Sequence, residues 1–216
     1  MAYFPFFVDI AGKKGLIVGG GTVALRKAEK LLPYGPALTV AAPELLPEFA
    51  SLPGLTLLSR PFAPELLEEM YFVIAASDDA PVNRQAAALC RERGILVNVA
   101  DDREACSFLF PSLVREGPLS VGISTGGASP SGAVWVKEQI RGLLPEGFAG
   151  ILEWLESVRP AVKEALPDQK DRETAYARLF AACLSLERPL QERELAELWE
   201  EFVPQNSSKR ETVDKI

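Results

Sequence analysis

A glycine-rich turn between an apolar run and a helical stretch restricts the fold more than any other segment of the chain. The run Gly15–Val18 is short and apolar, three glycines follow it, and Ala24–Leu32 has the pattern of a helix. In nucleotide-binding folds the first glycine permits a tight turn, here Gly19, and a later one, here Gly21, lets the backbone approach a pyrophosphate. The N–H groups at the start of the helix would bind the phosphates. Similar turns also occur with nothing bound, so the rest of the chain must decide.

A second apolar run, Ala37–Ala42, follows the helix at the spacing of a βαβ unit, which predicts a parallel sheet. In many such folds an acidic residue about 20 positions after the glycines accepts the ribose hydroxyls. The first carboxylate after this strand is Glu44, which would favour NAD over a 2′-phosphorylated cofactor. Alternatively, Pro43 and Glu44 begin the next helix, since both residue types suit a first turn.

The alternation of strands and helices continues along the chain. Leu55–Leu58 and Tyr71–Ala76 are strand-like, a helical stretch Pro64–Glu69 lies between them, and Pro81–Arg93 is the next predicted helix. In a doubly wound sheet the turn at Ser77 would face the same crevice as the glycines. Asp78 or Asp79 could instead cap the helix, and both roles can coexist.

The next predicted strand carries the best catalytic candidates. The segment Gly94–Asp102 delivers Asn98, Asp101 and Asp102 to its carboxyl end, and Ser107–Pro111 follows. A carboxylate beside apolar residues can be tuned for proton transfer. Adjacent aspartates at a strand end also cap helices or form turns, so this alternative stays open.

A last strand, Leu119–Ser124, leads into the small-residue loop Thr125–Pro130 and a helix predicted over Ser131–Leu144. Ser129 followed by Pro130 is a favourable helix start. The loop could admit a large flat ligand, or it could be a tight connection between strand and helix.

Composition excludes several classes of function. The chain contains no histidine, which excludes histidine-based acid–base catalysis, histidine-ligated metal sites and Ser-His-Asp hydrolysis. The net charge of −7 argues against a nucleic-acid partner. No apolar stretch reaches the roughly 20 residues that span a bilayer, and the start lacks the form of a signal peptide. We therefore expect a cytoplasmic protein without a membrane partner.

The length and the final third indicate more than one domain. With 216 residues, 48% of them hydrophobic, the chain can form one substantial α/β domain and a smaller appendage. Beyond Pro145 apolar residues recur at helical spacing, which predicts three amphipathic helices with Trp154 and Trp199 in their core, and Phe202 belongs to the last of them. Cys90, Cys106 and Cys183 are too scattered for a disulfide framework or a zinc site, and we interpret all three as buried thiols.

Six segments, in the order in which they occur, resemble a known family. They are Phe6–Asp9, Gly19–Ala28, Ala75–Asp79, Asn98–Asp101, Ala105–Phe108 and Ser124–Pro130. Together they are similar to precorrin-2 dehydrogenase, the dehydrogenase module of siroheme biosynthesis, which occurs alone or fused within siroheme synthase. The resemblance implies NAD-dependent oxidation of the tetrapyrrole precorrin-2 to sirohydrochlorin.

The resemblance also implies roles for individual residues. The family's catalytic aspartate follows Asn-Val-x and corresponds to Asp101, whereas Asp102 falls at a variable position. Cofactor contacts are implied near Thr22 and Val23 and near Pro43 and Glu44. Substrate contacts are implied at Asn98, Ser107 and Phe108 and in the loop formed by Thr125, Gly126 and Gly127.

The same resemblance implies the domain organisation and a homodimer. It divides the chain into an NAD-binding Rossmann-like domain (1–112), a dimerisation segment of strand, glycine-rich loop and helix (113–147) and a small helical domain (148–205). The polar composition of residues 206–216 predicts a disordered tail. Some family members also insert ferrous iron, and the sequence leaves this activity open while predicting no resident metal. Two other classes remain, an NAD-dependent dehydrogenase of another substrate and a non-catalytic NAD-binding sensor.

Overall fold

The computed structural model describes residues 3–200. The chain divides into two compact units, residues 1–110 and 111–216, and each unit is considered by itself below.

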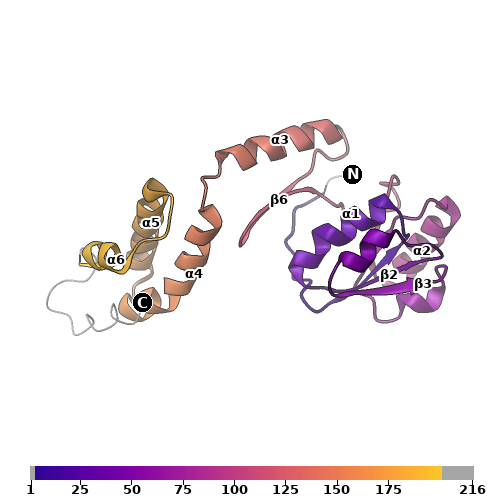
Figure 1. Cartoon of the computed structure of the whole chain (residues 1–216), viewed down its shortest axis with the longest axis horizontal. Coiled ribbons are helices and arrows are strands. Elements are labelled where there is room, and N and C mark those ends of the chain that lie inside the picture. Colours follow the sequence, from indigo (N-terminus) through magenta and orange to yellow (C-terminus); the bar gives the residue numbers. More distant parts are fainter. Residues whose placement is uncertain (1–2, 201–216) are drawn as a thin grey trace. The chain divides into compact units, whose positions relative to one another are not determined.

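The first unit is built on a five-stranded parallel sheet (Figure 1). The strand order is β3-β2-β1-β4-β5, so the chain starts in the centre, runs to one edge and then crosses back to the other side. This order confirms the predicted Rossmann-like fold, and its point of reversal lies between β1 and β4. The strands are β1 (Lys14–Val18), β2 (Ala37–Ala42), β3 (Leu55–Ser59), β4 (Phe72–Ala75) and β5 (Leu96–Val99).

Two helices cover the sheet, one on each face. Alternate residues of β1 point to opposite faces: Leu16 packs in the core cluster that contains Cys90 of α2 (Ala80–Arg93), and Ile17 packs in the cluster that contains Ala24 of α1 (Thr22–Leu31). All four side chains are fully buried, as expected for the central strand of a parallel sheet. The alanine in α1 lets the helix lie close to its strand.

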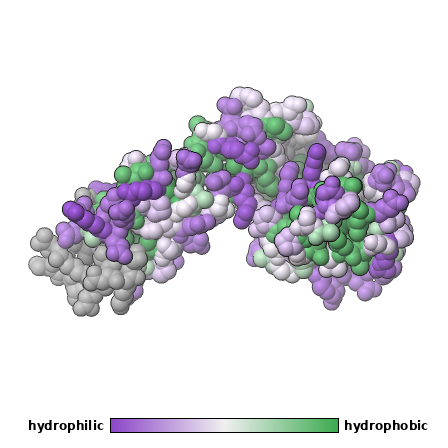
Figure 2. All heavy atoms as spheres, viewed as in Figure 1, coloured by the Kyte–Doolittle hydropathy of each residue, from purple (hydrophilic) through white to green (hydrophobic). Residues whose placement is uncertain are grey.

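The β3 edge of the sheet is more open than its centre. The outermost strand β3 has no buried residue, and Figure 2 shows hydrophobic residues in the middle of the visible face of this unit with hydrophilic residues around its margin.

The helix predicted over Pro64–Glu69 is wrong in type, because the chain forms only a 3-10 helix, η3 (Pro64–Leu67). Glu69 has a positive φ of 60°, which the α-helix does not allow. Two other 3-10 helices, η1 (Leu32–Tyr34) and η2 (Pro47–Ser51), follow α1 and β2.

The glycine turn after β1 is wedged between two neighbouring loops. Gly19 has a φ of +127°, and a Cβ at this position would lie 2.3 Å from the carbonyl oxygen of Ala76. A Cβ on Gly20 would lie 1.9 Å from the carbonyl oxygen of Glu44, and the N–H of Leu46 donates to the Gly20 carbonyl oxygen at 3.0 Å. The turn therefore holds the loops after β2 and β4 at a distance that only glycine permits.

The second unit begins with an antiparallel hairpin, β6 (Ser112–Glu116) and β7 (Leu119–Ile123). The sequence pattern predicts β7 but not β6. The reason is that β6 ends in two charged residues and buries only Val114, so that its conformation depends on pairing with β7. Helix α3 (Pro130–Leu143) follows, with Ser129 as its N-cap, as predicted; the Ser129 hydroxyl accepts from the N–H of Gly132 at 2.9 Å.

Three further helices, α4 (Phe148–Ala165), α5 (Gln169–Leu186) and α6 (Glu192–Trp199), form a separate core. The prediction of three helices after Pro145 is thus confirmed for the part of the chain that the structure describes. Trp154 and Trp199 pack in or against their core, as predicted. Phe202 and the tail 206–216 lie outside the described residues. None of the helices in residues 3–200 combines the length and apolar character needed to cross a membrane.

The thiols divide into two kinds. Cys90 and Cys183 are buried, and burial raises the pKa of the Cys90 thiol to about 11. Cys106 is only partly buried, which corrects the interpretation of all three as buried thiols. It follows β5 in a loop, where its sulfur has polar backbone partners.

We predict that Gly20→Ala destabilises the first unit, because the added methyl group must displace the backbone at Glu44. A cost of about 1–3 kcal/mol is typical of such overpacking. Urea unfolding followed by circular dichroism measures it. Gly21→Ala is the matched control, because a Cβ there has nothing within 4 Å, and its cost should stay below about 1 kcal/mol. Equal losses of stability in Gly20→Ala and Gly21→Ala would contradict the close contact between Gly20 and the backbone of Glu44.

Candidate functional site

A cleft of about 690 Å³ opens at the carboxyl ends of the strands, at the point where the strand order reverses. In open parallel sheets, ligands bind at this place. The cleft is lined by the segments 19–23, 42–47, 76–78 and 100–101, which lie at or directly after the carboxyl ends of β1, β2, β4 and β5. Four loops that are distant in sequence thus meet in one cavity.

The amino end of α1 faces this cleft without a side-chain cap. Its N-cap residue is Gly21, no side chain bonds the first turn, and that turn carries no acidic residue. By contrast, Asp79 caps α2 and Ser129 caps α3. The first-turn N–H groups of α1, at Thr22 and Val23, therefore remain available as donors, and the helix dipole adds positive potential. This arrangement suits a phosphate group.

Gly21 and Glu44 both line the cleft. A Cβ at Gly21 would meet nothing within 4 Å, so the backbone there is open to a ligand in the cleft. Pro43 and Glu44 line the same cleft. The alternative that they begin the next helix is wrong, because η2 starts at Pro47.

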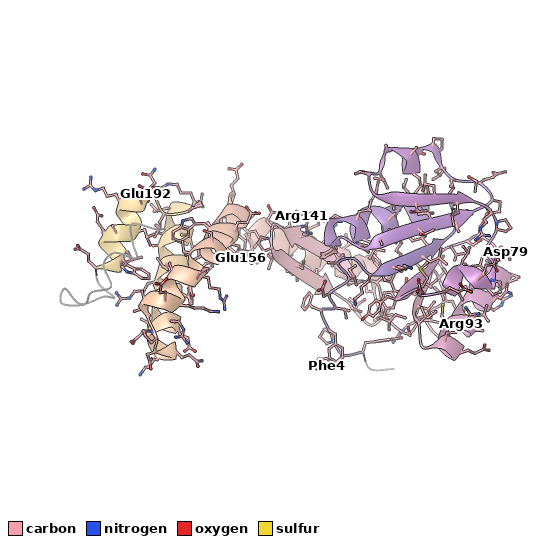
Figure 3. All side chains as sticks on the ribbon, turned by 90° about the horizontal axis from the view of Figure 1, so that it is seen from below. Phe4, Asp79, Arg93, Arg141, Glu156 and Glu192 are labelled. Atoms are coloured by element: carbon pink, nitrogen blue, oxygen red, sulfur yellow. The ribbon has the colours of Figure 1, made fainter. Side chains whose placement is uncertain are left out.

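Ser77 is fixed by a side chain that sequence reasoning missed. The Asn83 amide oxygen accepts from the Ser77 N–H at 3.1 Å, and its NH₂ group donates to the Ser77 carbonyl oxygen at 2.7 Å. Asn83 is only 7% exposed, so this pair of bonds clamps the turn after β4. An asparagine on the buried face of a helix was the available signal. Asp79, at the start of α2 in Figure 3, accepts from the Val82 N–H, so capping and cleft lining coexist in this turn.

Asp101 lies at the edge of the cleft in an unusual backbone conformation. Its φ is 61°, and the residue is exposed and lines the cavity. A non-glycine residue in the left-handed region is uncommon and occurs often at functional sites, although aspartate tolerates it better than most. Its neighbour Asp102 accepts from the Ala105 N–H at 3.1 Å and serves the turn. The two adjacent aspartates thus have different surroundings.

Asn98 is buried beside the cleft, and neither Asn98 nor its half-buried partners Lys27 and Phe108 belong to the cleft lining. Asn98 is 5% exposed; its NH₂ group donates to the Phe108 carbonyl oxygen at 3.1 Å, and its amide oxygen accepts from Lys27 Nζ at 3.2 Å. The Ser107 hydroxyl accepts from the Val97 N–H at 2.7 Å. Ser107 therefore has a structural role, because it extends the hydrogen bonding at the β5 edge of the sheet.

The loop with Thr125, Gly126 and Gly127 belongs to the second unit. The Thr125 hydroxyl donates to the Ser129 carbonyl oxygen at 3.0 Å and accepts from the Ser129 N–H at 3.1 Å. Gly126 and Gly127 both have positive φ. The loop is therefore a closed turn that leads into α3. Within residues 3–200, no group of three or more Cys, Asp or Glu side chains is placed to hold a metal ion.

The chain is similar to known proteins over most of its length. A family described as "Putative NAD(P)-binding" matches residues 6–112. Siroheme synthase from Chromobacterium violaceum is 43% identical over 171 residues, which are 78% of this chain and 36% of that protein. Siroheme synthase 2 from Aeromonas salmonicida is 39% identical over 183 residues, 84% of this chain and 38% of that protein. The chain thus spans well under half the length of these relatives.

A solved structure shares the fold of the chain. It is described as "SirC, precorrin-2 dehydrogenase" and superposes with a TM-score of 0.70 at 26% identity, covering 93% of this chain and 98% of that one.

We predict that Gly21→Ala leaves the fold intact and weakens dinucleotide binding about tenfold or more. The new methyl group would project where the backbone is open to the cleft, and it would keep a pyrophosphate from the first turn of α1. Isothermal titration with NAD measures the dissociation constant. Unchanged affinity in a folded Gly21→Ala protein would show that the phosphates bind elsewhere.

Proposed function

The chain belongs to the family shared by siroheme synthases and SirC, and we propose that it oxidises precorrin-2 to sirohydrochlorin with NAD as the oxidant. The single observation that carries this proposal is the position of Asp101, the aspartate of the family motif, at the edge of the cleft at the strand reversal. A dinucleotide cleft and a carboxylate beside it are the two parts that this oxidation needs.

The residues of the cleft fit NAD. The uncapped turn of α1 at Thr22 and Val23 would bind the pyrophosphate, and Glu44 would accept hydrogen bonds from a ribose. A carboxylate at that position favours NAD, because it repels a 2′-phosphate. When bound, NAD supplies the acceptor for a hydride.

A residue of the chain would accept the proton that the oxidation releases. Oxidation of the tetrapyrrole releases a hydride and a proton, and the Asp101 carboxylate would take the proton. The exposed position of Asp101 allows it to pass the proton on to water. Asp102 is held by the turn at Ala105 and has no part in this step.

We further propose a homodimer that works in the cytoplasm. The exposed apolar side chains of α3, among them Trp135 (64% exposed) and Leu143 (81%), support an interface. The three free cysteines are typical of a reducing compartment.

An anaerobic absorbance assay with precorrin-2 and NAD tests the proposed reaction. We expect the spectrum of sirohydrochlorin to form together with one equivalent of NADH. Ferrous iron added afterwards to the same cuvette separates a dedicated dehydrogenase from a bifunctional enzyme that also inserts iron. If NAD binds and precorrin-2 stays unchanged, the proposed substrate is wrong, and another dehydrogenase substrate or a sensor role takes its place.

We predict that Asp101→Ala and Asp101→Asn lower kcat about 100-fold or more, the range typical of a lost acid–base group. Asn tolerates the left-handed backbone, so Asp101→Asn isolates the carboxylate from the turn. The dissociation constant for NAD should not change. Asp102→Asn is the matched control and should retain turnover within about threefold. Full activity of Asp101→Asn would remove Asp101 from proton transfer.

A further inference from the structure

Lys27 is a cation that the reaction described above does not use. It lies in α1 one turn after Val23, and residues four positions apart share a face of a helix. Val23 lines the cleft, so the same face of α1 continues from the cofactor cleft to Lys27. The Lys27 ammonium group donates a hydrogen bond to the amide oxygen of Asn98 in β5, over an Nζ to Oδ1 distance of 3.2 Å.

An aromatic ring completes the surroundings of this ammonium group. Lys27 Nζ lies 3.8 Å from the centroid of the Phe110 ring, and Lys30 Nζ lies 5.9 Å from the same centroid. An ammonium group has three N–H donors, of which Asn98 takes one. The group is thus held in place, partly removed from water, and still able to donate to an anion.

The charges around Lys27 favour such an anion. Burial, and next the like charge of Lys30 on the same helix, lower the pKa of Lys27 to about 8, while Cys106 and Asp101 from the loop after β5 raise it. Burial and a neighbouring cation both penalise the charged form. A bound carboxylate would offset that penalty and would be desolvated together with the ammonium group.

We propose that Lys27, seated on Asn98 and the Phe110 ring, binds a carboxylate side chain of the tetrapyrrole substrate. This proposal rests on the proposed function for the identity of the substrate. Asp101 links the two places, because it lines the cofactor cleft and follows Asn98, the hydrogen-bond partner of Lys27, by three residues in the chain. In this proposal a substrate that reacts beside Asp101 extends toward Lys27. We call this proposed carboxylate-binding site of Lys27 the anchor. It gives a chain of negative net charge a local cation for an anionic substrate.

The pH dependence follows from the pKa. Lys27 is charged below about pH 8 and becomes neutral above it. Since a carboxylate binds the charged form, affinity for the tetrapyrrole should be full below pH 8 and should fall as the pH rises further. Removal of the Lys30 charge should move this fall to higher pH.

The test measures binding of sirohydrochlorin under anaerobic conditions, by absorbance titration from pH 6.5 to 9.5 with NAD present. We expect Lys27→Gln to raise the dissociation constant about tenfold or more at pH 7 and to abolish the fall above pH 8. Lys27→Arg should bind tightly across the whole range, and Lys30→Gln should shift the fall upward. Lys163→Gln, an exposed change of equal charge in α4, is the control and should bind like the unaltered protein.

The outcomes separate this inference from the proposed reaction. Equal affinity of Lys27→Gln and Lys163→Gln, or no binding of sirohydrochlorin by the unaltered protein, would overturn the anchor. Binding that depends on Lys27 in a protein that fails to oxidise precorrin-2 would support the anchor and reject the reaction. Because the readout is binding, a loss of turnover cannot be mistaken for the loss of the anchor.

Discussion

The close approach of the glycine turn to its two neighbours is the contact on which the site depends. Side chains at Gly19 and Gly20 would collide with backbone carbonyl oxygens at Ala76 and Glu44, so their absence brings three loops together at the end of β1. That proximity forms the cleft at the reversal of strand order, and the first turn of α1 lines it. Because backbone groups make these contacts, the geometry cannot be restored by a different side chain.

Local electrostatics in this protein oppose its overall charge. The net charge is −7, yet the proposed cofactor and substrate are both anions. Long-range repulsion fades over a screening length of about 8–10 Å in physiological salt, whereas a partly buried donor acts at contact distance. The uncapped N–H groups of α1 and the ammonium group of Lys27 lie on one helix, so a single element supplies positive potential to both ligands.

The sequence predicted the fold well where local patterns decide structure. Five apolar runs gave all five strands of the parallel sheet, and the glycines gave the position of the cleft, because period and backbone freedom are local properties. The strand β6 was missed, since its pairing with β7 supplies what its own composition lacks. Two side chains were also missed, Asn83, which binds Ser77, and Lys27, which binds Asn98. Each of these contacts joins residues on different elements. Side-chain geometry of this kind follows from the tertiary arrangement and has no sequence period.

The backbone of Asp101 shows how such contacts sustain a site. A residue in the left-handed region stores strain of about 1–3 kcal/mol and persists only if its surroundings fix it. Cys106 does this from the far side of the loop, since its sulfur accepts from the Val99 N–H at 3.1 Å and its thiol lies 3.2 Å from the Asp102 carbonyl oxygen. Cys106 therefore bonds Val99 of β5, which precedes Asp101, and Asp102, which follows it. These two bonds hold the Asp101 carboxylate at the edge of the cleft. A cysteine with these polar partners therefore acts here as a hydrogen-bonding residue, whereas Cys90 and Cys183 fill apolar cores.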